Sequence, residues 1–302
     1  MNLSELRISR RSVALAAAVA GMVSLAIGAH AALNMRALDA AKTIATQQSS
    51  EAAGKRPSRI ALVIGNGHYP DANAPLTQPI NDARALTASL RRDGFDVDVV
   101  EDATRDDMGR AIERLRSKIR PDSVVMLFFG GYGVQVGRES YMIPVDAAIW
   151  KESDVRRDGL SIESVLDVMK EQGACAKLVV VDASRRNPYE RRFRSFSHGL
   201  APITAPDNAL ILTSATPGQV ADDSAGQHSV LMSELLNNID SARDAAAAEP
   251  GKETDKAAVA AETVFNKTRV AISRASEGAQ VPSVSSSLLE DVRFGVTANA
   301  GG

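Results

Sequence analysis

Two segments of the sequence are apolar almost without interruption, and they constrain the fold more than any other feature. They run from Ser123 to Phe129 and from Lys177 to Ala183. A strand with one face in water alternates apolar and polar residues, whereas a strand that is covered on both faces does not. We therefore expect both segments to be central strands of a sheet with helices on its two faces.

Shorter strand-like segments and helical patterns alternate around these two runs. The strand-like segments are IALVIG, DVDVVE and ALILTSA, and the helical patterns cover residues 80–92, 105–119, 162–172 and 230–238. Such alternation is typical of βαβ units, which build parallel sheets. The sequence therefore predicts an α/β domain.

The first 33 residues have the pattern of a signal peptide. Arg10 and Arg11 precede an uncharged run over 12–35, as in a twin-arginine signal. A run of this length is also long enough to anchor the chain in a bilayer. In either case we expect the rest of the chain outside the cytoplasm, either periplasmic or secreted, with membrane contact only through this segment.

Three further segments lack the alternation of strand-like and helical patterns. Residues 34–58 are rich in alanine, glutamine and serine, which predicts a linker. The globular domain is expected over 59–295, with an insertion near 241–257 where alanine and charged residues surround a Pro-Gly pair. Residues 296–302 have the composition of a disordered tail.

Composition excludes several classes of function. The chain has 35 basic and 37 acidic residues, so no overall positive field favours nucleic acid as a partner. The one cysteine, Cys175, cannot form an intramolecular disulfide, and no Cys/His cluster is present to hold zinc. We expect neither a metal ion nor a cofactor, and we interpret Cys175 as a packing residue.

Loops at the carboxyl ends of parallel strands are the expected place for a ligand site. Three loops follow predicted strands in this way. They are GNGHYPDANAPL, GGYGVQVG and SRRNPYERRFRSFSHG. We expect the three loops to line one crevice.

Five motifs occur in a fixed order along the chain. They are ALVIGNGHY followed by PINDARAL, FFGGYGVQ, VVVDASRRNP, SATPGQVADD and SVSSSLLEDVRF. Together they resemble the caspase and metacaspase family of cysteine peptidases, in its bacterial form. The resemblance implies a three-layer α/β/α fold with a mostly parallel central sheet of about six strands. It also implies a large-subunit-like part over 59–200 and a small-subunit-like part over 207–295.

Two positions depart from the family pattern. The family has a histidine in the second loop and a cysteine after the Asp-Ala of the third, where this chain has Tyr132 and Ser184. A cysteine is a few per cent thiolate near neutral pH, and a neighbouring imidazole raises that fraction and protonates the leaving amine. A phenol with a pKa of about 10 is roughly 0.1% ionised at pH 7. We therefore expect a catalytically inactive homologue of these peptidases.

The resemblance also implies an oxyanion hole and an acidic substrate-binding residue in this chain. The backbone amides of Gly133 and Ser184 correspond to the oxyanion-hole donors of the family. Asp182 corresponds to an acidic residue that helps metacaspases to prefer basic residues, and Asp223 is expected in the same region. A groove for a peptide segment or a partner protein is thus implied, although Asp182 is also suited to capping a loop.

Two alternatives stay open. In the first, the chain is an active serine endopeptidase with a preference for basic residues, in which a histidine from another loop activates Ser184. His68 and His198 are the candidates, and His228 is a weaker one. In the second, the chain is a membrane-tethered scaffold that contacts its partner through an exposed sheet edge or an arginine-rich loop.

The arginine-rich loop has five arginines between residues 185 and 194. Such a cluster is able to bind carboxylates or phosphates in bidentate fashion, and a solvated loop is the alternative interpretation. The acidic pairs Asp154/Asp158 and Asp222/Asp223 lack the spacing of a calcium loop. The calcium activation that some metacaspases show is therefore not expected here.

Overall fold

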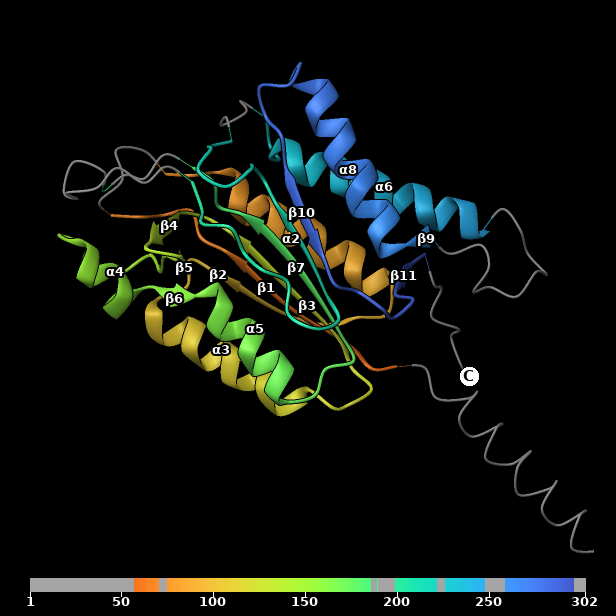
Figure 1. Ribbon diagram of the computed structural model, residues 1–302, viewed down its shortest axis with the longest axis horizontal. Helices are drawn as coiled ribbons and strands as arrows, with labels where there is room; N and C mark the ends of the chain where they lie inside the picture. The colour runs from red at the N-terminus through yellow and green to blue at the C-terminus, as the bar shows by residue number, and fades with distance from the viewer. Residues whose placement is uncertain are drawn as a thin grey trace, which may run out of the picture. The chain divides into compact units, whose positions relative to one another are not determined.

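Six strands form the central sheet, in the spatial order β10-β8-β7-β3-β1-β2 (Figure 1). They are β1 (Arg59–Gly65), β2 (Asp96–Glu101), β3 (Val124–Gly130), β7 (Ala176–Asp182), β8 (Ala209–Thr213) and β10 (Ser283–Ser286). Neighbouring strands are parallel, except that β10 is antiparallel to β8. The predicted mostly parallel sheet of about six strands is confirmed.

The computed structural model describes residues 57–70, 75–185, 189, 199–221, 226–247 and 259–295. The predicted leader, most of the linker, the tail and much of the predicted insertion lie outside these residues. Among the helices that are described, none has the length and apolar character needed to cross a bilayer.

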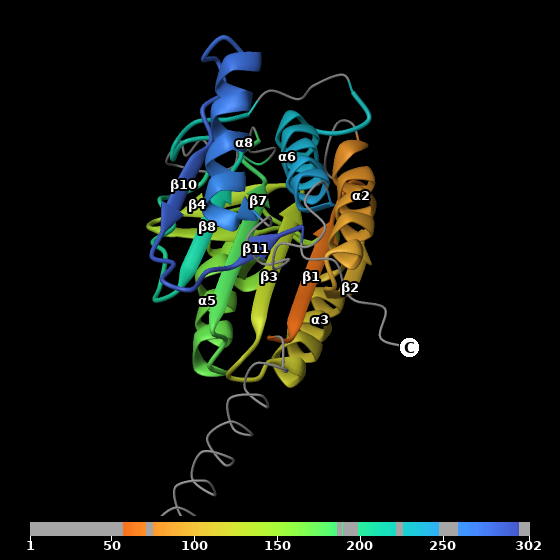
Figure 2. The ribbon, with the colours of Figure 1, turned by 90° about the vertical axis from the view of Figure 1, so that its right-hand side faces the viewer.

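Helices cover both faces of the sheet (Figures 1 and 2). On one face lie α2 (Gln78–Arg92), α6 (Val230–Ala247) and α8 (Ala261–Ala275). On the other face lie α3 (Arg105–Lys118) and α5 (Ile162–Glu171). The predicted three-layer arrangement is therefore confirmed.

The central strands are buried along their whole length. Every residue of β3 and of β7 is buried. Successive side chains of β3 point to opposite faces, so that Met126 and Phe128 pack beneath α2, while Leu127 and Phe129 pack beneath α3 and α5. This two-sided burial explains why both segments lack polar alternation.

One helix is longer than the pattern predicted. The apolar period indicated a helix over 230–238, whereas α6 continues to Ala247. The added residues include three consecutive alanines, 245–247. Ile239 and Ala242 extend the buried face of the helix beyond residue 238, and alanine, which has the highest helix propensity, favours helix in the turn that follows.

Two small sheets were not predicted. β4 (Gly133–Val136), β5 (Glu139–Met142) and β6 (Leu160–Ser161) form an antiparallel sheet, which packs with the short helix α4 (Glu152–Asp158). β9 (Val259–Ala260) pairs with β11 (Arg293–Phe294). The first of these sheets matters for the site, because β4 begins directly after Tyr132.

Candidate functional site

The ends of β3 and β7 bring two of the three loops together. In the register of these parallel strands, Gly130 pairs with Asp182, and Tyr132 and Ser184 each follow two residues later. Backbone hydrogen bonds continue past the strand ends, from the Gly131 N–H to the Asp182 carbonyl (3.3 Å) and from the Gly133 N–H to the Ala183 carbonyl (3.1 Å). Positions 132 and 184 therefore lie on adjacent segments at one edge of the sheet.

Ser184 lies in closed surroundings. Its exposed fraction is 1%, and its hydroxyl oxygen has no hydrogen-bond partner among the described residues. Its backbone N–H donates to the Ser214 hydroxyl (3.4 Å), and its carbonyl accepts from the Ala221 N–H (2.6 Å). A serine nucleophile needs a base within hydrogen-bonding distance, and no described group occupies that place.

Tyr132 is held by a second tyrosine. Its ring meets that of Tyr69 edge to face, with centroids 4.8 Å apart, and its backbone N–H donates to the Tyr69 hydroxyl (3.1 Å). Burial raises the pKa of the Tyr132 phenol above its usual value, and the positive charge of Arg185 offsets part of that rise. The phenol is therefore protonated at neutral pH.

Gly133, the predicted oxyanion-hole donor, already uses its N–H. That N–H donates to the Ala183 carbonyl, so a ligand carbonyl would have to displace this bond. A Cβ at this position would lie 2.6 Å from the side chain of Leu200, which explains the glycine. The role of Gly133 as a donor to a ligand stays a prediction.

Two buried aspartates interact with each other electrostatically, and one of them ends β7. Asp182 ends β7 and is 3% exposed, and Asp82 lies in the first turns of α2 with no exposed surface. Burial raises the pKa of Asp82 to about 6, with a further contribution from the negative charge of Asp182. Asp82 is not among the site residues predicted from the sequence, although PINDARAL contains a carboxylate near the start of a helix that follows β1.

Each aspartate has one basic partner among the described residues. Asp82 accepts from Nδ1 of His228 at 2.8 Å and from the backbone N–H of Ser229. The Arg185 guanidinium lies 4.0 Å from Oδ2 of Asp182. Arg185 is only 4% exposed, so the interpretation of the arginine cluster as a solvated loop is wrong for this residue. Arg186, Arg191, Arg192 and Arg194 lie outside the described residues.

The candidate bases for Ser184 are placed as follows. Nδ1 of His68 lies 2.6 Å from Oδ2 of Asp102, and the His68 side chain is 67% exposed. His228 binds Asp82, as described above. Neither of these two histidines forms a hydrogen bond with the Ser184 hydroxyl. His198 and the predicted substrate-binding residue Asp223 lie outside the described residues.

Comparison with known proteins places this fold in a family. A family model for the caspase domain of the C14 peptidases matches residues 58–293. The chain belongs to the caspase-domain family. It is similar to mucosa-associated lymphoid tissue lymphoma translocation protein 1 of Homo sapiens, with 29% identity over 133 residues. That match covers 44% of this chain and 16% of the human protein, and the homolog from Mus musculus gives the same figures.

Cys175 lies at the other end of β7 from the crevice of this caspase domain. It directly precedes β7, whereas Asp182 ends the strand. Its thiol donates to the Asp122 carbonyl (3.4 Å), and burial raises its pKa. Within the described parts of the chain, no three His, Cys, Asp or Glu side chains are grouped so that they could hold a metal ion.

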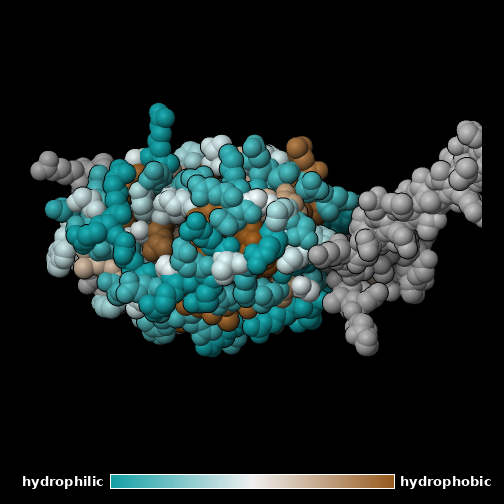
Figure 3. All heavy atoms as spheres, turned by 90° about the horizontal axis from the view of Figure 1, so that it is seen from below, coloured by the Kyte–Doolittle hydropathy of each residue, from teal (hydrophilic) through white to brown (hydrophobic). Residues whose placement is uncertain are grey.

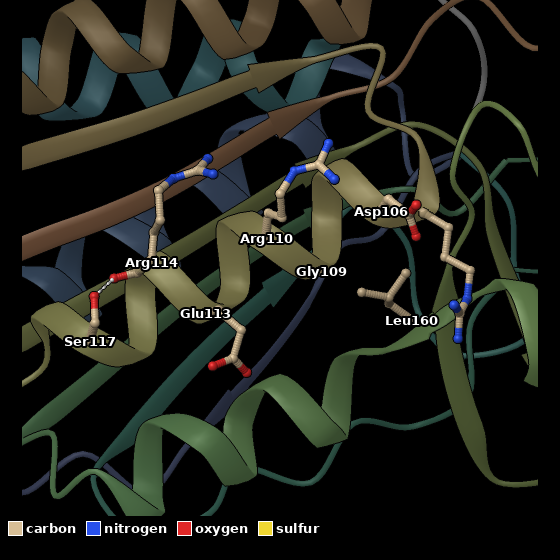
Figure 4. Close-up of a pocket in the computed structure, with 8 residues that line it drawn as sticks. Asp106, Gly109, Arg110, Glu113, Arg114, Ser117 and Leu160 are labelled. Atoms are coloured by element: carbon tan, nitrogen blue, oxygen red, sulfur yellow. Dashed lines mark hydrogen bonds between the residues drawn. The ribbon is translucent and has the colours of Figure 1, made fainter.

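The caspase domain also has a surface groove along α3 (Figure 4). It is lined by Arg105, Asp106, Gly109, Arg110, Glu113, Arg114, Ser117 and Leu160. Two of its arginines are neutralised locally, since Arg110 pairs with Asp107 and Arg114 with Asp98. Viewed from below Figure 1, the surface is largely hydrophilic with small, separate apolar areas (Figure 3). The groove contains none of the predicted site residues.

Proposed function

We propose that this caspase domain is catalytically inactive and binds a peptide segment or a partner protein through its crevice. The observation that carries the proposal is the environment of the Ser184 hydroxyl. The hydroxyl is buried and forms no hydrogen bond with a described residue. Ser184 follows β7, and the neighbouring strand β3 leads to Tyr132, where the family pattern has a histidine. A resting peptidase of this type needs an activated nucleophile.

The chemistry of the two replaced positions supports inactivity. A phenol with a pKa above 10 is less than about 0.1% ionised at pH 7, so Tyr132 supplies almost no base. A serine hydroxyl is a far weaker acid than a thiol and needs a stronger base. The Gly133 N–H, which would stabilise an oxyanion, is bound to Ala183.

The charge of the crevice supports a cationic ligand. Asp82 and Asp182 are both buried there, and their mutual repulsion helps to raise the pKa of Asp82. A basic side chain that forms hydrogen bonds with these carboxylates would relieve this repulsion. We therefore propose that the bound segment presents arginine or lysine.

Binding is tested with the full chain and a pair of labelled peptides. One is a fluorescein-labelled tetrapeptide, Gly-Ala-Leu-Arg amide, and the other has citrulline, the neutral isostere of arginine, at its end. The proposal predicts that the arginine peptide binds more tightly and that Asp182→Asn removes the difference. Equal affinity of the two peptides for the unaltered chain would contradict a basic ligand.

The alternative, an active serine endopeptidase, is tested with a fluorophosphonate probe. Such probes react with activated serine hydroxyls. We expect no labelling of Ser184 under conditions that fully label a control serine hydrolase. Labelling that is absent from Ser184→Ala would favour the alternative.

We also propose that the domain works outside the cytoplasm. The support is the sequence pattern of residues 1–33, in which two arginines precede an uncharged run. Fractionation of cells that express the full chain tests this placement. Arg10→Lys with Arg11→Lys should reduce export if the signal is of the twin-arginine type, and recovery of the unaltered chain only from the cytoplasm would contradict it.

A further inference from the structure

The surroundings of the buried Asp82 and Asp182 carboxylates, called the acidic pocket below, include a cation from the chain itself. Arg185 follows Ser184 directly, and its side chain is 5% exposed beside an Asp182 side chain that is 4% exposed. The guanidinium also lies close enough to Tyr132 to affect its ionisation. Arg185 therefore occupies the surroundings of both replaced positions and of the acidic pocket.

We propose that Arg185 is an internal ligand of this pocket, and that a basic side chain of a bound peptide displaces it. The inference rests on the proposed function and adds a regulatory step to it. The crevice is closed when Arg185 lies against Asp182 and open when Arg185 has left. Only the open state accepts the peptide.

Arg185 and Asp182 are too far apart to form a hydrogen bond between Nη2 and Oδ2. The distance between Nη2 of Arg185 and Oδ2 of Asp182 is 4.0 Å, whereas a charge-assisted hydrogen bond is about 2.7 to 2.9 Å long. Asp182 Oδ2 accepts no hydrogen bond among the described residues. A buried carboxylate is stabilised when it accepts hydrogen bonds. The arginine of a bound peptide, which can align two N–H groups with the carboxylate, would provide that stabilisation.

The backbone explains why Arg185 does not reach this alignment. Its own N–H donates to the Ala183 carbonyl at 2.8 Å, which holds its Cα close to the end of β7. Asp182 is only three residues away along the same segment. A side chain tied so close to its partner has fewer directions of approach than one that enters from a separate chain.

The Asp82 carboxylate also favours the binding of a cation from outside the chain. Asp82 is fully buried and is bound to His228, whose side chain is 34% exposed. The two carboxylates therefore share a half-exposed imidazole and one buried guanidinium among the described residues. Since a guanidinium of the described residues already lies beside Asp182, an incoming one competes with it for the carboxylates.

Competition of this kind has a measurable consequence. If the crevice is mostly closed, the apparent affinity for a peptide is reduced by the fraction of molecules that are open. Removal of the internal ligand should raise the affinity by the inverse of that fraction. The gain should be specific for a basic peptide and should depend on Asp182.

The test compares the unaltered full chain with Arg185→Met and uses Arg84→Met as a matched control. Arg84 is exposed and pairs with Glu101, so its replacement changes net charge by the same amount without touching the pocket. We expect Arg185→Met to bind the Gly-Ala-Leu-Arg amide peptide at least about tenfold more tightly than the unaltered chain. The citrulline peptide should show no such gain, and Arg84→Met should bind like the unaltered chain.

Two outcomes separate this inference from the proposed function. If the unaltered chain and Arg185→Met both prefer the arginine peptide with equal affinities, displacement is wrong and the proposed function stands. If neither protein distinguishes arginine from citrulline, the proposed basic ligand is wrong, and the inference falls with it.

A chemical measurement on the unaltered chain avoids the risk that Arg185→Met does not fold. Phenylglyoxal reacts with accessible guanidinium groups and can be located by mass spectrometry. A Gly-Ala-Leu-Lys amide peptide, which has no guanidinium, should increase the modification of Arg185 and leave that of Arg84 unchanged. Modification of Arg185 that stays constant at saturating peptide would contradict displacement.

Discussion

Each buried aspartate of the candidate site has one basic partner among the described residues. Asp182 has Arg185 and Asp82 has His228, and both aspartates are almost completely buried. A buried charge that loses its partner is strongly destabilising, whereas removal of both charges is often neutral. The contribution of each basic partner should therefore be measured together with that of its aspartate.

The first prediction concerns the pair at Asp182. Arg185→Met leaves a buried carboxylate without its cation and should lower the free energy of unfolding by about 3 kcal/mol at pH 7. The double variant with Asp182→Asn should recover most of that loss. Urea unfolding of the two single variants and the double variant measures the coupling. Purely additive losses would show that the 4.0 Å contact does not stabilise the fold.

The second prediction concerns pH. Burial raises the pKa of Asp82 in the folded chain to about 6 from an ordinary value of 3.8, so the folded state binds a proton more tightly than the unfolded state. This contribution to stability is complete below about pH 4 and is lost as the pH rises through about 6. The stability of the unaltered chain relative to Asp82→Asn should therefore increase when the pH falls from 7 to 4.

Thermal unfolding of both proteins across this pH range measures the effect. His228, Asp182 and Arg185 also face this region, so the comparison with Asp82→Asn measures the Asp82 carboxyl together with its interactions with these neighbours. A difference between the two proteins that does not change with pH would contradict the raised pKa.

At the scale of elements, the buried strands position the site. β3 and β7 are adjacent and parallel, and the loops that leave them carry Tyr132 and Ser184. The register of these strands is fixed by side chains on both faces, so the site geometry depends on the core beneath it. The small sheet that begins at Gly133 adds a second support for the loop after β3.

The third prediction tests this core. Leu127, at the centre of β3, has no exposed surface, and Leu127→Ala should destabilise the fold by about 2 to 5 kcal/mol through a cavity. Leu289 is 89% exposed, and Leu289→Ala should change stability by no more than about 0.5 kcal/mol. Urea unfolding measures both. Equal effects would mean that β3 is not buried as described.

Sequence patterns predicted the elements better than the contacts at the site. The unbroken apolar runs predicted β3 and β7, because two-sided burial removes polar residues. The sheet of β4, β5 and β6 was missed, since strands of two to four residues have too few positions to show a period. No local pattern indicates that Arg185 is buried, because arginine is usually exposed. The pairing of Asp82 with His228 joins residues that are distant in the chain, so no local pattern indicates it either.

At the scale of the whole molecule, a caspase fold is combined with a tyrosine at position 132 and a serine at position 184. The sheet order and the helical layers are those of a caspase domain, and positions 132 and 184 follow the ends of its two central strands. A fold does not by itself imply its usual activity, because function is determined by the site. The same scaffold can therefore serve binding without hydrolysis.

The central claim is that the crevice binds without cleaving, and turnover of arginyl and lysyl peptides tests it most directly. The full chain and its Ser184→Ala variant are assayed side by side with fluorogenic peptides at neutral pH. The account predicts no turnover by the full chain above that of the variant, because Tyr132 cannot activate a buried hydroxyl. Turnover by the full chain that Ser184→Ala abolishes would contradict it.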